Sequence, residues 1–136
     1  MFKTSGGKYI IPTLIENELK ESNFIEQVMV IGENQKMPAA LIQLNFEFIQ
    51  EWIERKNYDI NKDAESIITS SLVKERIQQE IDTCNKRFGK WEQIKRFELT
   101  PDVWSIDGGH LTPTMKMKRS VIIKHYDALV QNIYAD

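Results

Sequence analysis

The chain has 136 residues, 41% of them hydrophobic and 28% charged, which is enough to bury the core of a single soluble domain over residues 1–136. Its formal net charge of −2 gives no bulk attraction to nucleic acid, so we expect no nucleic-acid partner. No apolar run approaches the ~20 residues that span a membrane, and no signal peptide opens the chain, so we expect a cytoplasmic location.

The N-terminal segment contains a turn signal followed by a helix signal. Gly6 and Gly7 separate two short extended runs, which is typical of a tight turn in a β-hairpin. Pro12 suits the first position of a helix, and Thr13 and Glu16 have the spacing of a capping box. We therefore expect a hairpin and then a helix.

Two β-rich runs come next. Phe24–Ile31 and Ala39–Leu44 are rich in aliphatic residues and are separated by a polar segment, so they predict an antiparallel strand pair. Apolar residues recur at helical spacing over 46–53, and those of 67–88 predict one or two further helices.

The last third of the chain combines a strand, a loop and a helix. Arg96–Thr100 predicts a short strand, and 101–109 predicts a loop with a Gly-Gly turn. Apolar residues from Val121 to Ile133 predict one amphipathic helix. This mixture indicates an α+β fold, in which helices pack on a small, mostly antiparallel sheet.

Cysteine and histidine offer little chemistry in this pattern. Cys84 is the one cysteine, which excludes an internal disulfide, and its helical spacing with apolar residues predicts a buried, inert thiol. His110 and His125 have no compact ligand cluster around them in the sequence, so we expect no metal site, and we expect His110 to be a loop residue without a role. The three tryptophans predict packing anchors: Trp52, Trp91 and Trp104.

A lysine-bearing loop precedes the last helix. Residues 111–119 read Leu-Thr-Pro-Thr-Met-Lys-Met-Lys-Arg. Cations at a helix N-terminus oppose the helix dipole, so helix stability does not explain Lys116, Lys118 and Arg119. A lysine meets a phosphate as a point charge, and Pro113 stiffens the loop that carries it, so the segment suits a phosphate-handling site.

Three segments resemble the C-terminal domain of long-chain acyl-CoA synthetases, which are adenylate-forming enzymes. Lys3–Glu16 is similar to the segment that follows the interdomain hinge, and Phe24–Gly32 with Ala39–Ile42 looks like the next strand pair. Leu111–Arg119 resembles the C-terminal lysine motif. The resemblance covers nearly the whole chain and implies a mobile lid domain that begins just after the hinge, without the N-terminal ATP- and acyl-binding domain.

The resemblance implies a two-step reaction. A fatty acid and ATP give an acyl-adenylate and pyrophosphate, and coenzyme A then displaces AMP to give the acyl-CoA thioester. The small domain rotates between the steps. ATP, coenzyme A and Mg²⁺ are implied for the full-length enzyme, which is also compatible with peripheral membrane association. We expect none of these ligands to bind tightly to this chain alone, and we expect the chain alone to be inactive.

The resemblance also implies which residues act. In many adenylate-forming enzymes a glycine precedes the adenylation lysine, whereas this chain has Met115, so both Lys116 and Lys118 are candidates. We favour Lys116, because it places Ile122 where the family's helix carries an apolar residue, whereas Lys118 would place Lys124 there. Four residues are expected to line the tunnel for the pantetheine arm of coenzyme A: Ser5, Gly6, Gly7 and Lys8.

A second interpretation is a stand-alone module that binds a phosphate ligand or another protein through the same basic loop. It differs from the lid of a ligase because it needs no N-terminal partner domain.

Overall fold

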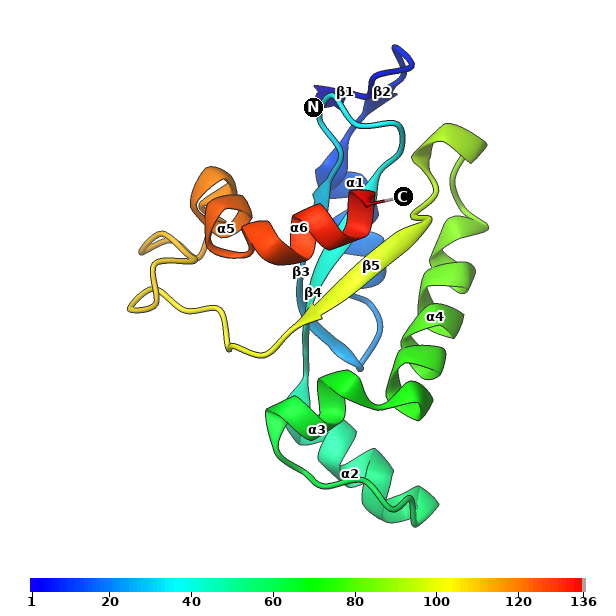
Figure 1. Ribbon diagram of the computed structural model, residues 1–136, viewed down its shortest axis with the longest axis vertical. Coiled ribbons are helices and arrows are strands. Elements are labelled where there is room, and N and C mark those ends of the chain that lie inside the picture. The colour runs from blue at the N-terminus through cyan, green and yellow to red at the C-terminus, as the bar shows by residue number, and fades with distance from the viewer. Residues whose placement is uncertain (136) are drawn as a thin grey trace.

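The N-terminal hairpin is confirmed in the computed structural model, which describes residues 1–135. Strand β1 (Phe2–Lys3) pairs antiparallel with β2 (Tyr9–Ile10), and Phe2 lies opposite Ile10. The turn between them projects from one end of the molecule (Figure 1). Its backbone is tied to the loop that follows β3, since the Ser5 amide donates to the carbonyl of Gln35 at 2.8 Å.

Helix α1 (Pro12–Leu19) begins at a proline, as the sequence predicts. The predicted capping box is wrong, because Ile11 is the N-cap residue and no side chain caps the helix. The Glu16 carboxylate is instead buried and accepts a hydrogen bond from the Val30 amide at 2.7 Å. A tertiary contact has therefore replaced the local one that the spacing indicated.

The main sheet has three strands in the order β3-β4-β5: β3 (Ile25–Ile31), β4 (Ala39–Leu44) and β5 (Arg96–Thr100). The predicted antiparallel pairing of β3 with β4 is confirmed. Strand β5 runs parallel to β4, which a chain achieves only through a long crossover. The crossover consists of α2 (Phe46–Lys56), α3 (Ala64–Thr69), α4 (Ser71–Asn85) and the short 3-10 helix η1 (Lys90–Glu92).

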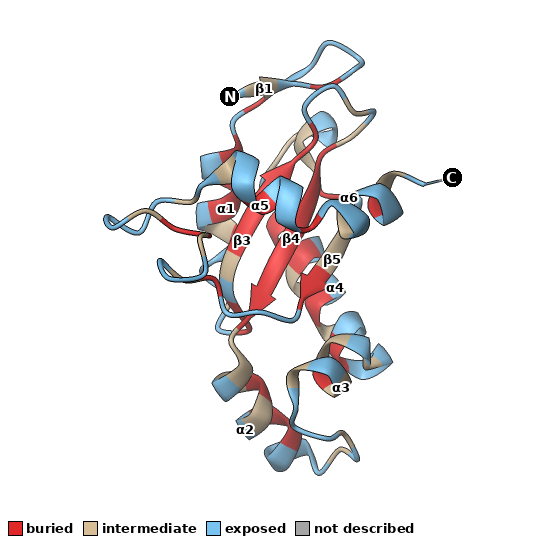
Figure 2. Ribbon diagram, turned by 60° about the vertical axis from the view of Figure 1, so that its left-hand side comes forward, coloured by how far each residue is buried: buried red, intermediate tan, exposed pale blue. Residues whose placement is uncertain are grey.

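The sheet is buried on both faces, as Figure 2 shows for β3 and β4. In β3, Val28 and Val30 belong to the core shared with α1 and α4, whereas Met29 and Ile31 belong to a second core on the opposite face. Because side chains alternate along a strand, a continuous apolar run covers both faces. The result is an α+β domain with helices on each side of a small sheet.

The second core is covered by two C-terminal helices, α5 (Arg119–His125) and α6 (Asp127–Tyr134). The sequence predicts one helix here, and that prediction is wrong at Tyr126, whose φ of −103° and ψ of 30° end α5. The Tyr126 ring is buried, and its hydroxyl donates to Asp102 at 2.9 Å. Among residues 1–135, no helix is both long and apolar enough to cross a bilayer.

The buried thiol and two of the three tryptophans follow the sequence prediction. Cys84 lies in the core beside α1, and burial raises the pKa of its thiol to about 11, which keeps it protonated and unreactive. Trp52 and Trp104 are buried. Trp91 is not a packing anchor, because half of it is exposed to solvent.

Candidate functional site: a lysine hairpin and a glycine turn

Residues 111–117 form a small hairpin, hereafter the lysine hairpin. Its stem is an antiparallel bridge between Leu111 and Met117. The Thr112 amide donates to the Lys116 carbonyl at 2.8 Å, and the Thr112 hydroxyl accepts from the Lys116 amide at 3.1 Å. Pro113 lies in the turn, where its fixed φ favours the bend. The segment is therefore an ordered support for Lys116 rather than a loose loop.

Met115 closes the turn of the lysine hairpin in the left-handed conformation. Its φ is 66°, and its amide donates to the Thr112 carbonyl at 2.8 Å. Glycine adopts this conformation without the clash that a β-carbon causes. Since Met115 is mostly exposed, packing does not explain why a methionine stands here.

Lys116 and Lys118 both face away from the core. Met117, which lies between them, is partly buried against the second core, and side chains alternate along an extended segment. Among residues 1–135, neither lysine side chain has an ion-pair partner. Lys118 differs from Lys116 because it is the N-cap residue of α5. Its amide donates to the His110 carbonyl at 2.8 Å.

Arg119 anchors the lysine hairpin to α1. Its guanidinium makes a two-pronged ion pair with Glu16, with N–O distances of 2.6 and 2.8 Å. The Glu16 side chain is only 4% exposed, so the pair is strong and geometrically specific. Hydrogen bonding to Glu16 raises the pKa of Arg119. The pair with Glu16 explains why Arg119 stands at a helix N-terminus, where the helix dipole is unfavourable to a cation.

The glycine turn, residues 4–8, is open to a ligand. Its ends are held by a 2.9 Å hydrogen bond from the Thr4 amide to the Lys8 carbonyl, and Gly7 has a φ of 85°. A β-carbon added at Gly6 or Gly7 would meet no atom within 4 Å. Backbone conformation therefore favours a glycine at position 7, whereas Gly6 has neither a left-handed φ nor a close neighbour.

Lys8 points toward Trp91. Its ammonium lies 5.4 Å from the centre of the indole ring, which joins the glycine turn to η1. Two other basic residues, Arg87 and Arg96, have partners within the fold. Arg87 pairs with Glu18 at 2.9 Å, and Arg96 donates to the carbonyl of Ile133 at 2.7 Å.

The glycine turn and the lysine hairpin lie on different sides of the domain. The turn is at the end of the molecule that carries β1 and β2, and the lysine hairpin is in the loop between β5 and α5 (Figures 1 and 2). The structure therefore does not bring the predicted site residues together. It presents them as two separate surfaces of one body.

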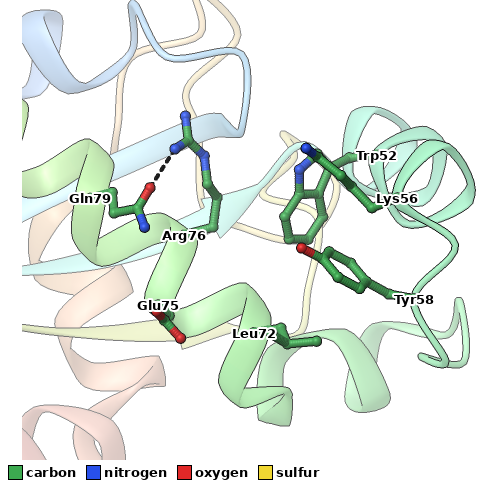
Figure 3. A pocket seen from close by; sticks show the side chains of 7 residues that line it. All are labelled: Trp52, Lys56, Tyr58, Leu72, Glu75, Arg76 and Gln79. Carbon is green, nitrogen blue, oxygen red and sulfur yellow. Dashed lines mark hydrogen bonds between the residues drawn. The ribbon is translucent and has the colours of Figure 1, made fainter.

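A hollow between α2 and α4 lies apart from both surfaces (Figure 3). Trp52 and Tyr58 meet edge to face within it, with ring centres 5.1 Å apart. Lys56 and Arg76 are the cations that line it, and Arg76 donates to Gln79 at 2.6 Å and to Glu80 at 3.2 Å. We assign no chemistry to this hollow.

The histidines are closer together than their separation in sequence indicates. Ligand atoms of Asp102, His110 and His125 all lie within 4.8 Å of one another, so the prediction that no compact cluster forms is wrong. The prediction that His110 has no role in the loop is also wrong, because its ring is buried and hydrogen-bonded. Sequence reasoning missed this cluster because Asp102, His110 and His125 are far apart in the sequence and meet only in the folded chain.

Comparison with known proteins identifies the family of the chain. A family model described as the AMP-binding enzyme C-terminal domain matches residues 2–136. The chain belongs to this family.

The relatives of this AMP-binding C-terminal domain include fatty acid–CoA ligases. A long-chain-fatty-acid–CoA ligase of Mycobacterium tuberculosis is 28% identical over 131 residues, which is 96% of this chain and 22% of that protein. Human long-chain-fatty-acid–CoA ligase 1 is 31% identical over 138 residues, covering 99% of this chain and 20% of that protein. The chain thus spans about a fifth of the length of these curated relatives.

Solved structures show the same fold as this AMP-binding C-terminal domain. The adenylation domain of a carboxylate reductase from Mycobacterium chelonae matches 99% of this chain and 19% of its own, with a TM-score of 0.78 and 17% identity. A fatty acyl CoA synthetase of Mycobacterium tuberculosis matches 90% of this chain and 19% of its own, with a TM-score of 0.55 and 19% identity. These neighbours confirm the predicted fold class.

Proposed function

We propose that this chain is the mobile C-terminal domain of an ATP-dependent long-chain fatty acid–CoA ligase. In this proposal, the ligase activates a fatty acid as its acyl-adenylate and then transfers the acyl group to coenzyme A. The lysine hairpin serves the first step and the glycine turn serves the second. The fatty acid–CoA ligase relatives, which match almost the whole chain, support the substrate class.

The conformation of Met115 is the observation that carries the assignment of Lys116. Many adenylate-forming enzymes have a glycine before the catalytic lysine, and Met115 adopts the backbone conformation that glycine favours. Aligning the two by conformation makes Lys116 the catalytic lysine and leaves Lys118 as the helix N-cap. This argument is independent of the apolar position in the following helix.

Lys116 would act on the charge that develops during adenylation. The fatty acid carboxylate attacks the α-phosphate, so two anions approach each other and the phosphate gains negative charge. An ammonium at this point orients both groups and stabilises the transition state. Because the lysine hairpin is ordered before substrate arrives, little reorganisation is needed at the moment of reaction.

The glycine turn would line the path of the pantetheine arm. Space around Gly6 and Gly7 lets a narrow chain approach the backbone closely, and Lys8 extends from the same turn toward Trp91. In this proposal Mg²⁺ would be held by the N-terminal domain together with the ATP phosphates, since Mg²⁺ typically binds through one or two carboxylates and the substrate phosphates.

The test separates the two half-reactions in the ligase that carries this domain. Lys116→Ala should lower acyl-adenylate formation by about 100- to 1000-fold, while thioester formation from supplied acyl-adenylate stays unchanged. Lys118→Ala is the matched control and should adenylate at nearly the normal rate. Normal adenylation by the Lys116→Ala ligase would overturn the assignment. Loss in Lys118→Ala alone would move the role to that residue.

A further inference from the structure

His110 is built into the base of the lysine hairpin. Its carbonyl accepts from the Lys118 amide at 2.8 Å, and its own amide donates to the Ser105 carbonyl at 3.0 Å. Leu111, the next residue, is fully buried and begins the hairpin stem. Any movement of the His110 backbone would therefore be passed directly to both ends of the hairpin.

The His110 side chain is held on both ring nitrogens. Nδ1 accepts a hydrogen bond from the Ser105 amide at 3.2 Å, so Nδ1 carries no proton and Nε2 does. Nε2 then donates to the Tyr126 hydroxyl, 3.3 Å away, and that hydroxyl donates to Asp102 at 2.9 Å. Every polar atom of the neutral ring is satisfied in this arrangement.

The surroundings fit the His110 ring closely. The ring lies nearly parallel to those of Trp104 and Tyr126, with centres 6.2 and 6.1 Å away. The Trp104 indole is fixed in turn by a 3.1 Å hydrogen bond to Thr100 on β5. A β-carbon at Gly108 would lie 2.8 Å from the His110 ring, so a glycine there leaves room for it. His110 thus connects the sheet, the loop and the bend between α5 and α6.

A metal ion is the other chemistry that an Asp-His-His cluster suggests, and the hydrogen bonds argue against it. A metal on Nε2 of His110 would require the proton to move to Nδ1, where the Ser105 N–H already points. Metal-bound histidines normally donate from their second nitrogen, whereas this one accepts. Asp102 already accepts the Tyr126 hydroxyl.

We propose that neutral His110 is a positioning residue for Lys116, and that protonation of His110 unseats the lysine hairpin. A proton on Nδ1 would face the Ser105 amide donor, which breaks that hydrogen bond and places a charge in a buried site. The inference rests on the proposed adenylation role of Lys116. It adds a residue that the family motif does not contain.

The surroundings of His110 favour its neutral form, chiefly through burial. Burial lowers the pKa of His110, and a charge on His125, whose ring meets it edge-on at 5.6 Å, lowers that pKa further. Asp102 and, least of the four causes, the Ser105 backbone raise that pKa, but burial and His125 outweigh them. The neighbours from the sheet side, Trp104 and Thr100, are uncharged.

The lowered pKa of His110 also fixes the sign of its effect on stability. The unfolded chain binds the proton more readily, so the contribution of His110 to stability is complete above its ordinary pKa near ~6.5. That contribution is lost as the pH falls from this value through the lowered folded pKa.

The kinetic test compares His110→Phe and His110→Asn in the ligase that carries this domain. The phenylalanine keeps the ring packing but loses both hydrogen bonds, and it should lower kcat of adenylation by roughly 10- to 100-fold with KM for ATP unchanged. The asparagine can still accept from the Ser105 amide and cannot become charged in this range. It should restore most of the rate and extend adenylation to lower pH, measured between about pH 5 and pH 8.

The outcomes separate the two proposals. A normal rate in His110→Phe, an equal loss in both half-reactions, or an unchanged acid limb in His110→Asn would overturn the positioning role. Unchanged adenylation in Lys116→Ala would instead overturn the proposed function. In either case, NMR on the chain reports the hairpin directly: the Lys116 and Lys118 amide signals should shift with the same midpoint as the His110 ring. Amide signals that do not follow the His110 ring would overturn the coupling.

Discussion

Met115 adopts a left-handed backbone conformation, which costs conformational free energy that a glycine would not lose. A non-glycine residue in this region loses about 1–2 kcal/mol, and glycine gives back roughly 0.5–1 kcal/mol through its greater freedom in the unfolded chain. Met115→Gly should therefore leave the free energy of unfolding unchanged or raise it by up to about 1.5 kcal/mol. Met115→Val should lower it by about 1–2 kcal/mol.

Urea unfolding of the two Met115 variants measures these differences. Met117→Gly is the control, because Met117 is in the stem and packs against the core, so it should be destabilising. A substantial loss of stability in Met115→Gly would mean that the methionine side chain, rather than the turn, determines the residue at this position.

The ion pair between Glu16 and Arg119 joins α1 to the start of α5. Removing one member leaves a charge without its partner, which typically costs 3–5 kcal/mol for a fully buried pair. Because a third of the Arg119 side chain is exposed, we expect about 2–3 kcal/mol for Arg119→Met. The double variant Glu16→Leu with Arg119→Met should recover part of this loss.

A double-mutant cycle by chemical denaturation measures the coupling between Glu16 and Arg119. Additive effects of the two single substitutions would show that the residues stabilise the fold independently. The exposed pair of Arg87 with Glu18 serves as the comparison, and there we expect less than about 1 kcal/mol.

The two glycines of the glycine turn give a matched pair of substitutions. Gly6 has open space around it and no left-handed requirement, so Gly6→Leu should fold normally and obstruct only a ligand. Gly7 has a φ of 85°, so Gly7→Ala should lower stability by about 1–2 kcal/mol.

Measuring both half-reactions distinguishes the effects of the two glycine substitutions. In the full ligase, Gly6→Leu should slow thioester formation and leave adenylation unchanged. Thioester formation at the normal rate would remove Gly6 from the coenzyme A path.

Elements that depend on local pattern were predictable from the sequence, and elements set by tertiary contact were not. The β3–β4 pair and the N-terminal hairpin follow from aliphatic runs and glycines. The capping box failed because Glu16 finds a buried partner on a distant segment. The single C-terminal helix failed because Tyr126 ends α5 where its hydroxyl reaches Asp102.

At the scale of the whole molecule, the two predicted surfaces lie apart on one body. The chain spans about a fifth of the length of its fatty acid–CoA ligase relatives, so we expect it alone to form no acyl-CoA from fatty acid, ATP and coenzyme A. Product analysis by mass spectrometry measures this, with the full ligase as the positive control. Acyl-CoA formed by the chain alone would contradict the lid proposal.

The candidate site was predictable only as far as sequence motifs reach. Lys116 and the glycine turn could be proposed from the sequence because each lies in a short contiguous motif. The hydrogen-bonded position of His110 was not predictable, because its partners Ser105, Tyr126 and Asp102 meet it only in the folded chain. Contacts between residues that are distant in the sequence leave no local pattern from which they could be predicted.

Glu16 has one more consequence, which concerns the free edge of the sheet. Strand β3 pairs with β4 on one side only, and its Val30 amide points to the Glu16 carboxylate instead of to another strand. An unpaired strand edge is a template on which a second chain can add. Because Glu16 occupies that amide, we expect its loss to make this edge available to a second chain and so to favour aggregation as well as unfolding.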